Sequence, residues 1–242
     1  MIENLTKKIY PQFHKKKIQR KNPDIIKVGF VSSFFCDHVI SKLFKNWIIK
    51  LDKKKFKTSV YHLGLKSDHI TNLIKDNCYS FYQNTNVEKA ISKIESDQLD
   101  ILVFLDIGME PKLQILGSLK LAPVQCCAYG VPVTTGFKSI DFFLSGDLME
   151  INSSDLHYSE KLVKLPQLGV DYETIKKIDL DKSPYRKEKN RFIFLILQSN
   201  FKLLPQHDHI FFEIIKKNKK CKFLFIGTKN KFVASKFKKR IL

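Results

Sequence analysis

The sequence predicts an α/β protein built on a parallel β-sheet, and three observations support that fold class. Short apolar segments alternate with amphipathic segments of helical period along most of the 242 residues. Glycines stand where three of the apolar segments end, at Gly64, Gly108 and Gly130. A polar, charged stretch over residues 171–191 separates two such patterns, which indicates a larger first domain and a shorter second one.

The first pattern opens with a strand over residues 25–31, whose run Ile-Ile-Lys-Val-Gly-Phe-Val is typical of a buried parallel strand. Residues 40–51 follow as an amphipathic helix, because apolar residues recur there at i, i+3, i+4 and i+7. The pattern then predicts strands over residues 58–63, 101–105, 124–128, 140–144 and 162–165, and helices over residues 68–76, 87–96 and 113–119.

The second pattern predicts a strand over residues 192–197, a helix over 205–217 with Pro205 in its first turn, a strand over 223–227 and a Lys-rich helix over 230–240. Two parallel strands make a poor independent sheet, so we expect this second domain to be incomplete. The domains expected are a basic lead-in over 1–24, an N-terminal half over 25–170, a linker over 171–191 and the beginning of a C-terminal half over 192–242.

Composition limits the class of protein. Hydrophobic residues make up 43% and charged residues 28%, which predicts a packed core rather than a disordered chain. No apolar run approaches the ~20 residues that span a bilayer, and the Lys-rich N-terminus has no apolar secretory segment. The five cysteines form no C-x-x-C pair, which favours reduced thiols in the cytoplasm over a disulfide framework or a zinc module. We expect no membrane partner.

The net charge of +19 suggests nucleic acid as a partner, but its distribution weakens that hypothesis. Residues 1–22 carry a net +6 and residues 213–242 a net +10, which leaves +3 for everything between. Only four of the 43 basic residues are Arg, the side chain that suits base edges and bidentate phosphate contacts. A solvated Lys-rich surface is the simpler interpretation of the charge, and nucleic acid binding is kept as an alternative hypothesis.

Two candidate functional positions follow predicted strands of the first domain. Asp37-His38 lies between the first strand and the first helix, so His38 is either a general base or substrate-positioning group, or an N-cap with a solvated ring. Asp106 ends the most apolar strand, where a carboxylate either has a function or caps the next loop.

Two loops complete the candidates. The loop over residues 130–136 holds two Gly, one Pro and the hydroxyls of Thr134 and Thr135, so backbone or hydroxyls could meet a ligand, although it matches neither a Walker A loop nor a dinucleotide fingerprint. The run Gln198-Ser199-Asn200-Phe201-Lys202 follows the first strand of the second domain; it is either a phosphate-holding turn with Lys202 as the cation or a plain surface turn.

The order of several segments is more specific than any one of them. These are Val28-Gly29-Phe30-Val31-Ser32-Ser33 with Asp37-His38, Leu102-Val103-Phe104-Leu105-Asp106-Ile107-Gly108, Leu121-Ala122-Pro123-Val124-Gln125, Pro132-Val133-Thr134-Thr135-Gly136, His157-Tyr158-Ser159-Glu160-Lys161-Leu162 and Phe201-Lys202-Leu203-Leu204-Pro205. In this order they closely resemble the catalytic region of the O-linked N-acetylglucosamine transferase family, in its bacterial SPINDLY-like branch, over residues 27–225.

The resemblance implies a GT-B glycosyltransferase with two Rossmann-like domains: a catalytic half over 25–170 and the start of a nucleotide-sugar-binding half over 192–242. It implies inverting transfer of a sugar, foremost N-acetylglucosamine from UDP-N-acetylglucosamine, to Ser/Thr hydroxyls of proteins, with neither a metal nor another cofactor. The partners implied are a nucleotide-sugar donor and a protein or peptide acceptor.

The resemblance also implies residue roles. His38 matches the active-site His, as base or acceptor-positioning group. Lys202 matches the Lys that steadies the donor diphosphate, with Gln198 and Ser199 in the adjoining turn. Thr134, Thr135 and Gly136 match the loop beside the donor sugar. Since family members continue past the region matched here, the alternative is a non-catalytic remnant or protein-binding subunit, inactive by itself.

Overall fold

The computed structural model describes residues 2–15, 24–172, 191–228 and 230–241. The chain forms two compact units: unit 1, residues 1–174, and unit 2, residues 175–242. Of the linker expected over 171–191, residues 173–190 lie outside the described residues, as do residues 16–23 of the expected lead-in.

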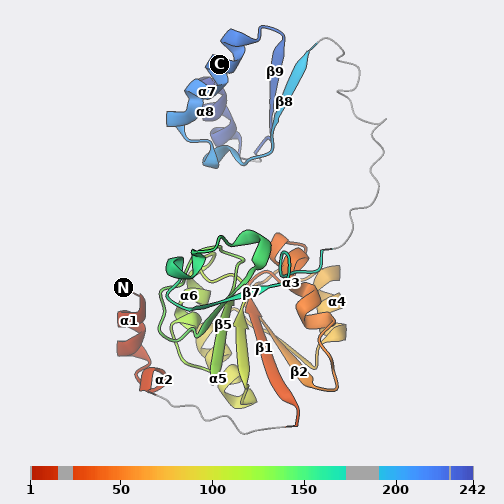
Figure 1. Ribbon diagram of the computed structural model, residues 1–242, viewed down its shortest axis with the longest axis vertical. Helices are drawn as coiled ribbons and strands as arrows, with labels where there is room; N and C mark the ends of the chain where they lie inside the picture. The colour runs from red at the N-terminus through yellow and green to blue at the C-terminus, as the bar shows by residue number, and fades with distance from the viewer. Residues whose placement is uncertain (1, 16–23, 173–190, 229, 242) are drawn as a thin grey trace. The chain divides into compact units, whose positions relative to one another are not determined.

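Unit 1 is built around a seven-stranded sheet in the order β3-β2-β1-β4-β5-β6-β7 (Figure 1). Its strands are β1 (Ile26–Ser32), β2 (Phe56–His62), β3 (Ser80–Gln83), β4 (Ile101–Phe104), β5 (Val124–Ala128), β6 (Phe142–Gly146) and β7 (Lys161–Leu165). Each neighbouring pair is parallel, and Val28 of β1 lies opposite both Thr58 and Ile101. The α/β class with a parallel sheet is therefore confirmed.

The strand order reverses between β1 and β4. The chain steps from β1 outward to β3 and then returns past β1 to β4. In sheets of this kind, ligands bind outside the carboxyl ends of the strands at such a reversal, because the two connecting segments diverge there. The topology thus selects one place in unit 1, the carboxyl ends of β1 and β4, as the position to search for a site.

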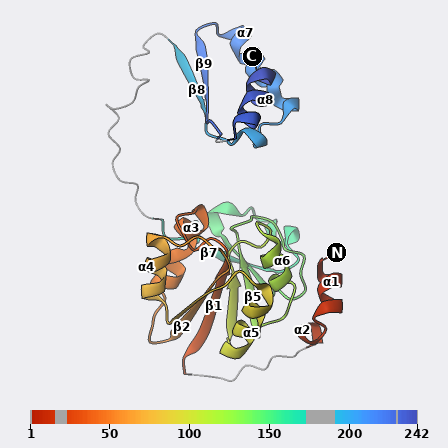
Figure 2. The ribbon, with the colours of Figure 1, turned by 180° about the vertical axis from the view of Figure 1, so that it is seen from behind.

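Helices connect these strands and cover the sheet. The connecting helices are α3 (Val39–Ile49), α4 (His69–Asn77), α5 (Val87–Asp97) and α6 (Pro111–Gly117). Because crossovers between parallel strands are right-handed, α3 and α4 lie on one face and α5 and α6 on the other, and α3 contacts α4 while α5 contacts α6. Figures 1 and 2 show the unit from opposite sides.

The core of unit 1 lies between the sheet and these helices. Val31, Leu102, Phe104 and Phe143 of the strands are fully buried, as are Phe44 of α3 and other helix residues. Side chains cap the N-termini of α3, α4 and α5; in α4, the Asp68 carboxylate accepts from the amides of Ile70 and Thr71. Such caps hold the beginning of these three helices next to the carboxyl end of the preceding strand.

Two features of unit 1 go beyond the sequence analysis. Strand β3 was not predicted, because its four residues, three half-buried and one exposed, pair with β2 alone and show no sustained apolar run. Residues 2–15, placed in a lead-in, form α1 (Ile2–Ile9) and α2 (Gln12–Lys15), and α1 contacts α6. The hydroxyls of Thr6 and Ser118 lie 2.9 Å apart, and Phe13 is buried in the core, so this segment packs on unit 1.

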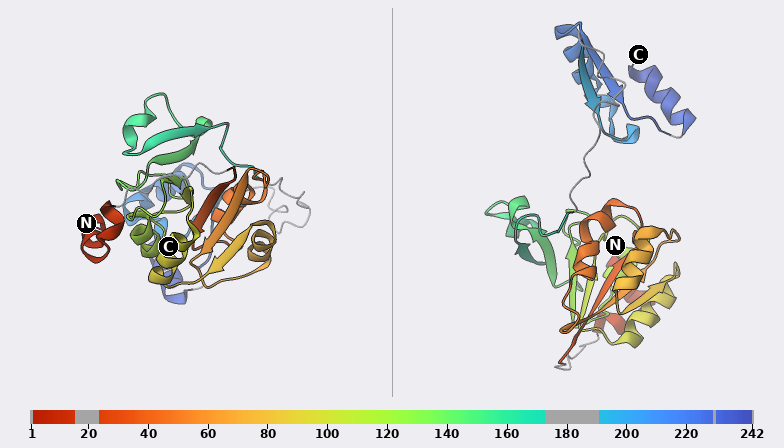
Figure 3. Two further views of the ribbon diagram at one scale, coloured as in Figure 1. Left: turned by 90° about the horizontal axis from the view of Figure 1, so that it is seen from below. Right: turned by 90° about the vertical axis from the view of Figure 1, so that its right-hand side faces the viewer.

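Unit 2 contains a two-stranded parallel sheet and two longer helices (Figures 1 and 3). Its elements are β8 (Phe192–Ile196), the short 3-10 helices η4 (Asn200–Lys202) and η5 (Pro205–His207), α7 (Asp208–Lys217), β9 (Cys221–Phe225) and α8 (Lys231–Ile241). The predicted strands and helices are all present, with ends displaced by at most two or three residues.

Candidate functional site

His38 lies at the carboxyl end of β1 and is the N-cap of α3. Its Nδ1 accepts a hydrogen bond of 3.3 Å from the Ile40 amide. The loop that carries it is fixed by neighbouring helices, since Ser41 donates to the Phe34 carbonyl at 2.7 Å and Thr71 to the Phe35 carbonyl at 2.6 Å. His38 therefore caps α3, as one of the two alternatives from the sequence proposed, and this cap holds the ring in place beside the β1–β4 reversal.

The surroundings of His38 favour its neutral form. Partial burial lowers the pKa of the imidazole, the charge of Lys66 lowers it further, and Asp37 opposes both. The ring stacks on Phe34, with centroids 4.2 Å apart. Because Nδ1 accepts an amide proton, the proton of the neutral ring is on Nε2, which leaves an N–H donor for a ligand.

Asp106 follows β4, on the other side of the reversal, and is fully buried. Neither carboxylate oxygen has a hydrogen-bond partner among the described residues. Burial raises the pKa of Asp106 to about 7; the nearby Ser32 hydroxyl favours ionisation without making a well-aligned hydrogen bond, and Glu110 disfavours it. Such a carboxyl group can hold a proton near neutral pH. Because its oxygens accept no hydrogen bond from the described residues, Asp106 does not cap the next loop, which was one of the two alternatives for this residue.

The loop after β5 approaches the end of β4 so closely that it requires a glycine. A Cβ on Gly130 would lie 2.1 Å from the Leu105 carbonyl oxygen, and the Gly130 amide donates to that oxygen at 3.1 Å. Backbone-to-backbone contact of this kind fixes where the rest of the loop begins. The loop thus runs at the same edge of the sheet as His38 and Asp106.

The two threonines of this loop turn toward Glu160, a residue to which the sequence analysis assigned no role. The Thr134 hydroxyl donates to Glu160 Oε2 at 2.7 Å, and the Thr135 amide donates to Oε1 at 2.8 Å. The Thr135 hydroxyl also donates to Oε1. The hydroxyl contacts with a ligand that the sequence suggested are therefore replaced, in this structure, by contacts inside the protein.

Gln198, Ser199 and Lys202 lie together in unit 2, between β8 and η5. Gln198 Oε1 accepts from the Ser199 amide at 3.1 Å, and the Lys202 amide donates to the Ser199 carbonyl at 2.9 Å. The side chains of all three residues are exposed. A cation in an exposed turn directly after a parallel strand is in a position to meet an anionic ligand.

An ion pair between α7 and α8 supports this turn. Arg240 Nε lies 2.8 Å from Asp208 Oδ2, and the same guanidinium donates to the Leu203 carbonyl at 2.6 Å. Asp208 is buried. Arg240 lies at the end of the Lys-rich helix that the sequence predicts, and its contacts with residues 32 to 37 positions earlier have no local signal.

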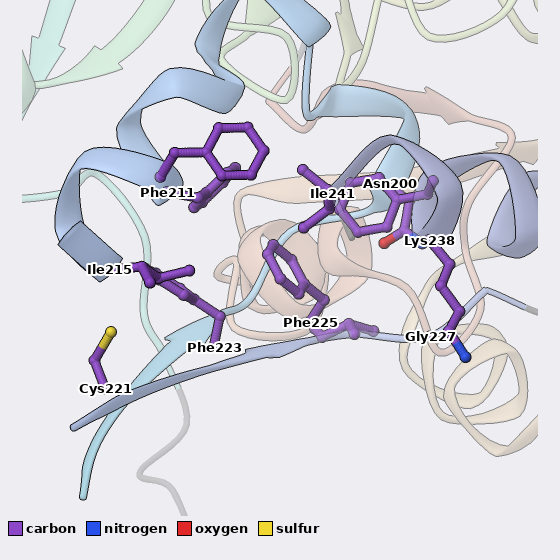
Figure 4. A pocket seen from close by; sticks show the side chains of 12 residues that line it. Asn200, Phe211, Ile215, Cys221, Phe223, Phe225, Gly227, Lys238 and Ile241 are labelled. Atoms are coloured by element: carbon purple, nitrogen blue, oxygen red, sulfur yellow. The ribbon is translucent and has the colours of Figure 1, made fainter. Parts of the chain in front are cut away.

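A cavity of about 530 Å³ lies beside these elements in unit 2, between β9 and the helices α7 and α8 (Figure 4). Apolar side chains such as Phe211, Ile215, Phe223 and Phe225 line it, and Lys238 and Asn200 stand at its margin. None of the predicted donor-site residues lines this cavity.

No metal-binding group is present in the described parts of the chain, where no three His, Cys, Asp or Glu residues gather suitably. All five cysteines are free thiols. No helix among the described residues is both long and apolar enough to cross a bilayer.

A parallel sheet with the strand order reversed between β1 and β4, followed by a second strand–helix unit, defines a GT-B-type α/β protein. A solved structure of an O-GlcNAc transferase mutant from Thermobaculum terrenum has this fold. It superimposes with a TM-score of 0.77 at 16% identity and covers 99% of this chain and 47% of its own.

The family model of glycosyl transferase family 41 matches residues 1–174, and the chain belongs to that family. Among curated relatives, a probable UDP-N-acetylglucosamine–peptide N-acetylglucosaminyltransferase SPINDLY from Solanum lycopersicum is 26% identical over 68% of this chain and 18% of its own length. The similarly named SEC from Arabidopsis thaliana is 25% identical over 79% and 21%. The chain thus spans about a fifth of the length of these relatives.

Proposed function

We propose that this chain is part of an inverting, metal-independent glycosyltransferase of the cytoplasm that moves N-acetylglucosamine from UDP-N-acetylglucosamine to Ser/Thr hydroxyls of proteins. The observation that carries the proposal is the position of His38 and of the Thr134–Gly136 loop at one edge of the sheet, in a member of glycosyl transferase family 41. The names of the relatives support the donor and the peptide acceptor.

In the proposed reaction, the acceptor oxygen attacks the anomeric carbon on the face opposite the diphosphate. The carbon–oxygen bond to the diphosphate breaks, UDP leaves with the electron pair, and the acceptor proton is released. Lys202, in its exposed turn, supplies a cation for the developing negative charge. Backbone amides near it can assist, so this charge stabilisation requires no metal ion.

His38 acts as the acceptor-positioning group in this proposal. Its Nδ1 lone pair is used by the Ile40 amide, so the neutral ring offers an Nε2–H donor rather than a free base. The lowered pKa of His38 supports this assignment, because it favours the neutral ring. A general base would first have to break the helix cap.

The decisive experiment is a calorimetric titration of the purified chain with UDP-N-acetylglucosamine, followed by a transfer assay on acceptor peptides. We expect Lys202→Ala to weaken donor binding by about 10-fold or more, as expected for loss of a charged contact. His38→Ala should leave donor affinity within about twofold and reduce transfer by about 100-fold or more. Lys216→Ala, an exposed cation paired with Glu213, is the control and should change neither. Absence of heat at millimolar donor would contradict autonomous catalysis.

The second candidate is a non-catalytic, protein-binding subunit. The exposed apolar side chains of unit 2 favour it, since Leu197 and Phe201 are 71% and 74% exposed. A subunit of this kind would give no heat with the donor and no transfer, so the same titration distinguishes the two candidates.

A further inference from the structure

The carboxylate of Glu160 is the centre of a hydrogen-bonded cluster that joins two segments 25 residues apart. Glu160 directly precedes β7 and is 5% exposed. Its two oxygens accept from the Thr134 hydroxyl, the Thr135 amide and the Thr135 hydroxyl. A single side chain therefore binds the loop after β5 to the beginning of β7.

The cluster uses the hydroxyl proton of both threonines. Thr134 Oγ1 donates to Glu160 and accepts from the amides of Ser159 at 3.1 Å and Gly136 at 3.3 Å. Thr135 Oγ1 donates to Glu160 and accepts from the Phe137 amide at 3.2 Å. A hydroxyl has one donor and two acceptor positions, so neither threonine has a proton left to donate to a ligand.

The charge of Glu160 is maintained by these donors. Burial alone would raise its pKa, but the hydroxyls of Thr135 and Thr134 and the backbone amides hold the pKa below its ordinary value. Hydrogen bonds to a charged carboxylate stabilise the loop more than hydrogen bonds between neutral groups would, because bonds to charged groups are stronger. The turn is consequently held in one conformation at neutral pH.

The other side of the turn is open. Gly136 has a φ of +69°, and no atom outside its neighbours lies within 4 Å of the position of a Cβ. Its glycine is required by the left-handed backbone, not by lack of space. What the turn offers to a ligand is thus main chain, while the threonine side chains face Glu160.

We propose that Glu160 is a positioning residue that holds the Thr134–Gly136 turn so that its backbone, and not its threonine hydroxyls, contacts the sugar of the donor. The inference rests on the proposed function. The chemistry of the turn agrees with a neutral sugar ring rather than with the diphosphate, because a fixed carboxylate lies directly behind the two threonines and repels a second anion. Sugar hydroxyls can pair with main-chain groups at no such cost.

The test compares the affinities of two ligands, UDP-N-acetylglucosamine and UDP, in wild type, Glu160→Ala and Glu160→Gln. We expect Glu160→Ala to weaken UDP-N-acetylglucosamine about 10-fold or more and to leave UDP within about twofold, because UDP lacks the sugar. Glu160→Gln keeps one carbonyl oxygen as an acceptor and should recover part of the loss. Equal weakening of both ligands, or of neither, would overturn the proposal.

A matched control is Glu150→Gln, which makes the same chemical change at another partly buried carboxylate of this region. Glu150 accepts from the Tyr158 hydroxyl at 2.7 Å and does not contact the turn. We expect it to change neither affinity. Thr135→Val combined with Glu160→Ala should weaken UDP-N-acetylglucosamine by less than the two single changes added together, since both remove the hydrogen bond between the Thr135 hydroxyl and Glu160.

Amide hydrogen exchange tests the positioning role without any ligand. The Thr135 amide, which donates to Glu160, should exchange about 10-fold faster or more in Glu160→Ala, while amides of β4 keep their wild-type rates. Unchanged Thr135 exchange would overturn the inference, even if the affinities fall. A wild-type chain that binds neither nucleotide would contradict the proposed function, and the Thr135 amide would then decide the role of Glu160 by itself.

Discussion

Unit 1 and unit 2 share one alternation of parallel strands and helices, but they bury their apolar side chains to different extents. In unit 1, Leu102 and Phe104 of β4 are completely buried. In unit 2, Phe194 and Leu195 of β8 are 38% and 56% exposed, and a cavity of about 530 Å³ lies between β9 and the helices. The same local pattern therefore gives a filled core in one unit and an open one in the other.

The difference follows from the number of strands. Strands β1 and β4 each have a paired strand on both sides and helices on both faces, so their side chains from Val28 and from Leu102 onward are buried. Both strands of unit 2 are edge strands, and the aromatic contacts of Phe223 and Phe225 with Phe211 and Phe237 place both helices on one face of the pair. A parallel sheet needs both faces and its neighbouring strands before apolar residues are covered.

The largest expected difference is in core truncations. Phe104→Ala should lower the free energy of unfolding of unit 1 by about 4 kcal/mol, because a fully buried ring leaves a cavity. Phe194→Ala, the counterpart in β8, should cost about 1 kcal/mol, since part of its surface already meets water. Denaturant titration followed by the fluorescence of Trp47, the single Trp of the chain, measures unit 1, and amide exchange measures unit 2. Similar costs in the two units would contradict the interpretation.

Glycine substitutions give the next effect. Gly130→Ala should destabilise unit 1 by about 3 kcal/mol, because its Cβ would lie 2.1 Å from a backbone oxygen that cannot move away cheaply. Gly227→Ala in unit 2 should change stability by about 0.5 kcal/mol or less, since no atom lies within 4 Å of the new Cβ. Thermal denaturation of both variants checks the pair, and a neutral Gly130→Ala would argue against the close approach of the two loops.

Two buried aspartates should respond in opposite directions to replacement by Asn. Asp106 has no hydrogen-bond partner among the described residues, and the difference between 3.8 and its pKa of about 7 sets an upper bound of about 4 kcal/mol on the cost of ionising it in the folded protein. The stability that protonated Asp106 provides is fully present below its pKa of 3.8 in the unfolded chain. It is lost as the pH rises toward its pKa of about 7 in the folded protein. Asp106→Asn should thus stabilise unit 1 by about 2 kcal/mol at pH 8 and by almost nothing at pH 4.

Asp208, in unit 2, is paired with Arg240, so Asp208→Asn should destabilise that unit by about 1 to 2 kcal/mol by removing a charged partner. Unfolding measured for both variants at pH 4, 6 and 8 provides the comparison. A stabilisation by Asp106→Asn that is the same at every pH would rule out ionisation as its cause.

Most of the secondary structure could be predicted from the sequence, because the strands of a parallel sheet are continuous apolar runs and the helices between them are amphipathic. β3 escaped prediction because an edge strand of four residues needs no such run. The helices of residues 2–15 escaped because their attachment depends on the Thr6–Ser118 contact across 112 positions, which has no local signal.

For the candidate site, sequence reasoning located His38, Asp106 and the loop over 130–136 at strand ends. It did not anticipate Glu160, because the partners of a buried carboxylate are chosen by folding and lie 25 residues away. No local signal marks its burial, because the strand that follows Glu160 contains two Lys and its residues are half-buried or exposed.

By itself, the sequence determined the class of fold, the number and order of most elements and the strand ends at which the candidate site residues stand, since those depend on local periodicity and on short-range turn chemistry. Tertiary structure alone decided which polar groups remain available to a ligand. It committed His38 Nδ1 to a helix cap and the hydroxyls of Thr134 and Thr135 to Glu160, and it left Asp106 buried without a partner. Hydrogen bonds between distant segments set these outcomes, and periodicity along the chain carries no information about them.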